Sequence, residues 1–135
     1  MTEEADNTFA GAWYSYHWYP TIDDAAEESS EYQMTAHQEG DQVVFESKPT
    51  ENGAYMLARL DIDGDIASGS WHEDTSPQGE YEGMLYSGAG QLIVAKDKRT
   101  MEGLWAGAGM DHTANKLRIY TGRWEFRRER RPSTD

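Results

Sequence analysis

The sequence predicts an all-β protein, namely a single antiparallel up-and-down β-barrel of eight to ten strands. Aromatic residues make up 12% of the chain and alternate with polar residues in short runs, as in half-buried strands. Thirteen glycines punctuate these runs, and no stretch sustains the 3.6-residue apolar period of an amphipathic helix. A chain of 135 residues is long enough for one domain with its own core.

The alternation and the turn residues between the runs define nine expected strands. Three turns, Glu39-Gly40-Asp41, Glu51-Asn52-Gly53 and Asp63-Gly64-Asp65, contain residues that tolerate positive φ. Consecutive hairpins leave two open sheet edges, and closing the sheet into a barrel removes them. In chain order, the expected strands cover residues 9–19, 31–38, 42–48, 54–62, 66–73, 80–87, 90–97, 100–109 and 116–127.

Three segments are expected outside the strands of the barrel domain, which spans residues 9–127. The acidic stretch 20–30 is predicted to be a mobile loop over a barrel mouth. Residues 1–8 are predicted to be a disordered N-terminus, and residues 128–135 a basic, disordered tail.

Composition excludes several classes of protein. The chain has no cysteine, which excludes disulfides, thiolate zinc sites, iron–sulfur clusters and a cysteine nucleophile, and fits a cytoplasmic location. No run approaches 18 apolar residues and the N-terminus is acidic, so we expect neither a membrane span nor an export signal.

The charge pattern bears on possible partners. The formal charge is −13, and residues 1–47 contain eleven acidic residues and no lysine or arginine. Binding to duplex nucleic acid is not expected, because it requires basic residues that neutralise phosphates. Residues 127–131 contain four arginines, which form either a solvated tail or a contact for an acidic protein partner or a phosphate.

Four of the five tryptophans follow a glycine by two residues, at Trp13, Trp71, Trp105 and Trp124. Residues two apart in a strand share a face, so each glycine is expected to clear space beside its own indole. The four indoles are therefore predicted to share the barrel interior, where they either fill it or stack on a ligand.

Extending this face along the strands defines a candidate lumen. Polar groups gather there among the aromatic residues, and a buried Glu73 or Arg118 requires a partner, either in the protein or in a ligand. The two interpretations are a small-molecule pocket and a structural ion pair that closes one barrel end. The candidate ligand-binding residues are Trp13, His17, Tyr19, Trp71, Glu73, Trp105, Arg118, Tyr120 and Trp124.

Parts of the sequence resemble known families. The run from Trp71 to Gly88, with Met101–Gly107 and Gly122–Glu125, resembles the β-rich C-terminal domain of actinobacterial XRE-type helix-turn-helix regulators. That resemblance implies a sensory module, and since this chain lacks the helix-turn-helix, it implies a protein partner for any regulatory output. Gly11-Ala12-Trp13 also resembles the opening motif of lipocalins, in keeping with a calycin-like barrel.

Three functions remain open from the sequence. The leading hypothesis is a non-enzymatic sensor barrel that holds a small aromatic ligand, whose anionic or hydrogen-bonding group Arg118, His17 and Tyr120 would bind. An enzyme similar to lipocalin-like phenolic acid decarboxylases would use Tyr14, Tyr16, Arg59 and Glu73, and the third function is a protein-interaction module. The four histidines lack metal-ligand spacing, so no metal and no cofactor are expected.

Overall fold

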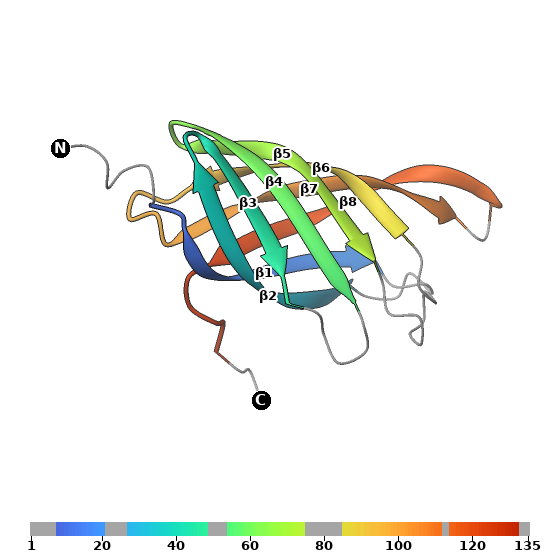
Figure 1. Ribbon diagram of the computed structural model, residues 1–135. Coiled ribbons are helices and arrows are strands. Elements are labelled where there is room, and N and C mark those ends of the chain that lie inside the picture. Colours follow the sequence, from blue (N-terminus) through green and yellow to red (C-terminus); the bar gives the residue numbers. More distant parts are fainter. Residues whose placement is uncertain (1–7, 21–26, 49–53, 75–84, 112–113, 133–135) are drawn as a thin grey trace.

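The computed structural model describes residues 8–20, 27–48, 54–74, 85–111 and 114–132, which form a closed antiparallel β-barrel (Figure 1). Each strand pairs with its neighbours in sequence, and β1 pairs with β8. The strands are β1 (Gly11–Pro20), β2 (Glu27–Glu39), β3 (Gln42–Ser47), β4 (Tyr55–Asp63), β5 (Ile66–Asp74), β6 (Leu85–Val94), β7 (Thr100–Asp111) and β8 (Lys116–Arg127). The predicted up-and-down barrel is confirmed, with eight strands in the described residues, which include no helix able to span a membrane.

Two of the expected boundaries are wrong. The strands expected at 80–87 and 90–97 are one strand, because Gly88 and Gly90 continue the β5–β6 ladder instead of turning. Residues 27–30, expected in a loop, belong to β2 because the long strand β1 supplies ladder partners as far as Pro20. Predictions for residues 1–7, 21–26, 49–53, 75–84 and 133–135 lie outside the described residues.

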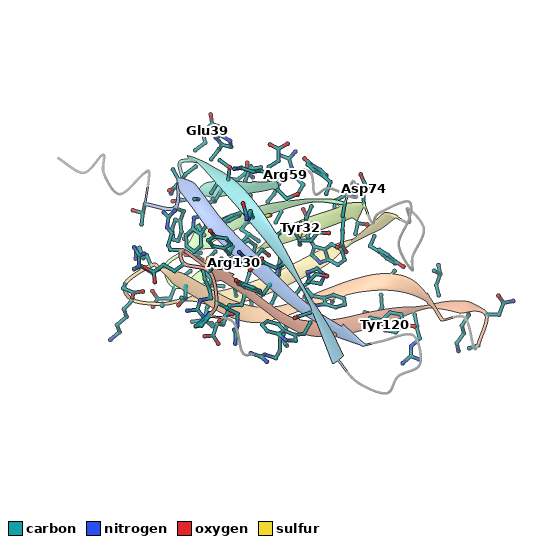
Figure 2. The ribbon with its side chains drawn as sticks, turned by 90° about the horizontal axis from the view of Figure 1, so that it is seen from below. Tyr32, Glu39, Arg59, Asp74, Tyr120 and Arg130 are labelled. Atoms are coloured by element: carbon teal, nitrogen blue, oxygen red, sulfur yellow. The ribbon has the colours of Figure 1, made fainter. Side chains whose placement is uncertain are left out.

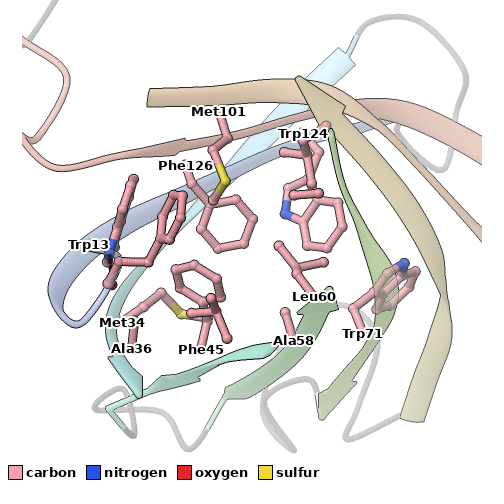
Figure 3. Close-up of a cluster of buried hydrophobic side chains, with 14 of the residues drawn as sticks. Trp13, Met34, Ala36, Phe45, Ala58, Leu60, Trp71, Met101, Trp124 and Phe126 are labelled. Atoms are coloured by element: carbon pink, nitrogen blue, oxygen red, sulfur yellow. Dashed lines mark hydrogen bonds between the residues drawn. The ribbon is translucent and has the colours of Figure 1, made fainter. Parts of the chain in front are cut away.

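Alternate side chains of the strands point inward and form one aromatic core (Figure 3). Trp13 and Trp124 are each 1% exposed, and Trp71 and Trp105 are each 9% exposed, which confirms the predicted inward face. Phe45 packs against two other core rings, with its ring centroid 5.7 Å from that of Trp13 and 4.5 Å from that of Phe126. Aromatic rings thus fill the half of the barrel around Trp13.

The glycines of the Gly-x-Trp motifs do not act as predicted. A Cβ atom at Gly103 would overlap the carbonyl oxygen of Gln91, and one at Gly69 would overlap that of Arg59. These glycines therefore allow a neighbouring strand to approach closely, and they do not make room for the indole two residues further on. Three of the four inward indoles instead pack on a glycine of another strand: Trp124 on Gly90, Trp71 on Gly107 and Trp105 on Gly122. The glycines therefore allow the sheet to coil tightly and leave a flat backbone surface against which the indole rings pack.

The two ends of the barrel differ. At one end, tight turns at Gly40 and Gly64, both with positive φ, connect the strands as predicted. The opposite end, here called the mouth, is formed by the ends of β1, β3, β5 and β7 and the starts of β2, β4, β6 and β8. Toward the mouth, the β1–β8 ladder ends at His17, before β1 itself ends at Pro20, and the β7–β8 hairpin continues as an arm beyond the barrel (Figure 1).

Residues 128–131, which belong to the segment predicted to be a disordered basic tail, contact the outer face of the barrel. The backbone N–H of Arg131 donates a hydrogen bond to the Tyr16 hydroxyl at 2.8 Å, and that hydroxyl donates to Glu31 at 2.6 Å. Arg130 pairs with Glu31 at 2.8 Å, and Arg131 pairs with Glu125. Burial, reinforced by the bond to Glu31, raises the pKa of Tyr16. This segment thus ties β2, β1 and β8 together across the short β1–β8 ladder.

Candidate functional site

A cluster of polar and aromatic side chains lies inside the barrel at the mouth. Because side chains alternate along a strand, β1, β2 and β5 bring His17, Tyr32 and Glu73 inward from three separate parts of the sequence. Four more rings belong to this cluster, which we call the mouth site: Trp71, Tyr86, Trp105 and Tyr120. Figure 2 shows Tyr32 within the barrel and Tyr120 further toward the arm.

The carboxylate of Glu73 is the centre of the mouth site. The hydroxyl of Tyr32 donates a hydrogen bond to its Oε2 at 2.6 Å. The Nε2 atom of His17 lies 3.8 Å from the same oxygen, and the imidazole stacks on the Tyr32 ring with an interplanar angle of 8°. The side chain of Glu73 is only 14% exposed, so this carboxylate lies in an environment of low polarity.

Burial decides the protonation of the groups around Glu73. It lowers the pKa of His17 below its ordinary value of 6.5, although the charge of Glu73 opposes the shift, so the imidazole is neutral at pH 7. Burial also raises the pKa of Tyr86, and the charge of Glu73 adds to this effect, so the Tyr86 hydroxyl keeps its proton. A negative carboxylate is therefore surrounded by neutral aromatic groups.

Two indoles pack edge to face in the mouth site. The ring centroids of Trp71 and Trp105 are 5.7 Å apart with an interplanar angle of 86°, and His17 stands at 88° to Trp105. Trp105 donates its Nε1–H to the carbonyl of Trp18 at 2.9 Å, just past the residue where β1 leaves β8. Trp71 donates to the carbonyl of Ala89 at 3.2 Å. These hydrogen bonds hold both rings in fixed orientations.

The structure brings together only some of the predicted site residues. Trp13 donates to the carbonyl of Phe9 and Trp124 donates to the hydroxyl of Ser15; each is 1% exposed and belongs to the filled core. Arg118 is exposed on the arm, where its guanidinium lies 5.1 Å from the ring centroid of Tyr120. The side chain of Tyr19 lies outside the described part of the chain.

Two residues of the mouth site were missed from the sequence. Tyr32 belongs to the run Tyr32-Gln33-Met34-Thr35-Ala36, whose alternation places it on the core face of an expected strand. This alternation is a local signal that identifies Tyr32 as an inward residue. Tyr86 could not be placed, because the break expected near Gly88 separated it from the ladder of Gly90 and Leu92.

The residues of the enzyme hypothesis do not meet. Tyr14 and Tyr16 are on the outer face of β1, where Tyr16 contacts Glu31. Arg59 is exposed on the outside of β4 (Figure 2), whereas Glu73 points inward. These four side chains therefore do not form one site. Within the described residues, no three histidine, aspartate or glutamate side chains come together as metal ligands.

A recess of about 240 Å³ lies on the outer face of the barrel. It is lined by Trp18, Glu102, Gly103, Leu104, Arg123, Trp124 and Glu125. The guanidinium carbons of Arg123 and Arg131 lie 4.2 and 5.3 Å from the ring centroid of Trp18. The protein's own arginines thus already occupy the aromatic surface of this recess.

The closed eight-strand antiparallel barrel is consistent with a calycin-like fold. A scan against protein-family models and searches of curated proteins and of solved structures found no match to this chain. Its function must therefore be inferred from the mouth site.

Proposed function

We propose that this barrel is a non-enzymatic, sensor-like module that binds a small, partly apolar molecule at its mouth. The observation that carries the proposal is the partly buried Tyr32–Glu73 hydrogen bond among the aromatic side chains at the mouth. Aromatic walls with a few convergent polar groups are typical of small-molecule sites. The resemblance to the sensory domain of helix-turn-helix regulators supports the same class of function.

The chemistry of the site favours a ligand with a hydrogen-bond donor. Glu73 is an acceptor, and His17 is neutral, so an anionic ligand group would meet a buried negative charge. The anion-binding role expected for Arg118 is not retained in this proposal, because that side chain is exposed on the arm.

A thermal-shift screen of a broad metabolite library tests the proposal. A ligand at one hundred times its dissociation constant adds about 2.7 kcal/mol of stability, which raises the Tm of a domain this size by about 9 °C. The shift should disappear in Glu73→Gln and persist in Glu46→Gln, whose carboxylate accepts a similar tyrosine hydrogen bond on the exposed outer face, from Tyr55. A library without any hit would contradict the proposal.

A protein-interaction module is the second candidate, because apolar side chains are exposed on the outer face near the arm. Leu104 is 60% exposed, Leu117 is 68% exposed and Ile119 is 65% exposed. If no small molecule shifts the melting temperature, and if Leu117→Ser combined with Ile119→Ser abolishes binding to a partner protein, this account is the better one.

A further inference from the structure

We propose that the ligand of the mouth site is a cation that carries an alkylated ammonium group. This inference deepens the proposed function and rests on it. It is drawn from the charge of Glu73, the orientation of the surrounding rings and the electrostatic field of the whole barrel.

The carboxylate of Glu73 has a neutral environment inside the barrel. Its contacts in the described structure are the Tyr32 hydroxyl at 2.6 Å and His17 at 3.8 Å. No lysine or arginine in the described part of the chain forms an ion pair with it. A buried carboxylate without a cationic partner destabilises the empty barrel, and a bound cation would compensate that charge.

The rings around Glu73 have the geometry that attracts a cation. The face of an aromatic ring carries negative electrostatic potential, and several rings set at right angles can surround an ammonium group. Trp71 and Trp105 pack edge to face at 86°, so a cation would meet the ring surface that this contact leaves uncovered, and Tyr86 lies close enough to Glu73 for the carboxylate to influence its pKa. At the rim, Tyr120 already has the guanidinium of Arg118 at 5.1 Å from its centroid.

The site also selects between kinds of cation. A strongly hydrated ion such as sodium would lose its water on contact with the indole and phenol rings of the mouth site, whereas alkyl groups on nitrogen pack against those rings. Outside the site, the formal charge of −13 attracts cations toward the barrel and repels anions.

Three probes test this inference by NMR, the first two of them matched in size and shape, with the indole N–H signals of Trp71 and Trp105 followed at constant ionic strength. They are choline, its neutral carbon analogue 3,3-dimethylbutan-1-ol, and benzoate as an anion. We expect choline to bind at least about tenfold more tightly than the alcohol, because only choline gains the cation–π and carboxylate attraction. If the alcohol or benzoate binds as tightly as choline, or if choline does not bind, the cation inference is wrong.

Variants locate the effect. Glu73→Gln should reduce choline affinity to that of the alcohol and leave the alcohol unchanged, whereas Glu46→Gln on the outer face should change neither. Arg118→Ala should raise choline affinity about two- to threefold, because it removes a competing cation at the rim, whereas a site for anions would lose affinity. Library ligands that bind without a positive charge would overturn this inference and leave the proposed function intact. The comparison of choline with the alcohol needs no variant, so it holds even if Glu73→Gln does not fold.

Discussion

Replacing Gly103 with alanine tests how the glycines shape the barrel. In the structure a Cβ atom at this position would overlap the carbonyl oxygen of Gln91 and lie 2.6 Å from the Cα atom of Leu92. Both are backbone atoms of β6, so no side-chain rotation relieves the overlap. Strands β6 and β7 would have to separate where Gly103 and Leu92 face each other.

The expected cost follows from three contributions. Overpacking a close contact costs about 1–3 kcal/mol, and the strand separation weakens about two ladder hydrogen bonds worth about 0.5–1.5 kcal/mol each. Alanine restricts the unfolded chain more than glycine does, which returns about 0.4–1 kcal/mol. The net loss is about 3 kcal/mol, equivalent to about 10 °C in Tm for a domain of 135 residues.

Thermal and urea unfolding followed by circular dichroism measures this loss. The control is Gly40→Asn, since Gly40 has φ of +62° with nothing within 4 Å of a Cβ, and asparagine tolerates this conformation. The control should change stability by less than about 0.5 kcal/mol. A Gly103→Ala protein as stable as this control would refute the close approach of β6 and β7.

Three further predictions concern protonation, the C-terminal segment and the mouth end of β1. Burial lowers the pKa of His17, so below pH 6.5 the unfolded chain binds more protons than the folded protein, and the free energy of unfolding falls as the pH drops. Between pH 7 and 5 this decline should be shallower in His17→Gln, whereas it should be unchanged in His37→Gln, since His37 is exposed. Tyr16→Phe should lower the urea-unfolding free energy by about 1 kcal/mol, more than Tyr55→Phe, whose hydrogen bond is exposed. Trp105→Phe removes the bond to the Trp18 carbonyl and should speed amide exchange at the mouth end of β1, while the protection of Phe45 in the core stays unchanged.

Much of the fold was predictable because its signals are local. Alternation identified seven of the eight strands in the described residues, and the Gly-x-Trp spacing placed Trp13, Trp71, Trp105 and Trp124 on the inner face. Turn glycines at positions 40 and 64 marked two hairpins. The exception was β6, where glycines inside a strand have the same sequence signature as glycines at a turn.

The mouth site was only partly predictable, because its members meet across the barrel. Alternation placed His17 and Glu73 on the inner face, where a buried Glu73 was expected to need a partner in the protein or in a ligand. The hydrogen bond from Tyr32 to Glu73 joins residues 41 positions apart, and local pattern does not specify such a pair. Arg118 follows the inner-face alternation, yet its strand runs past the barrel rim, where the inner face meets solvent.

The sequence by itself determined the period-two pattern, the direction of the aromatic face and an acidic surface without thiols. Only the tertiary structure decided which residues meet at the mouth and which glycine each indole packs against. The physical reason is that side-chain direction along a strand is set by neighbouring residues, whereas register and closure depend on backbone pairing between distant strands. Which side chains lie beside Glu73 therefore depends on how the barrel closes.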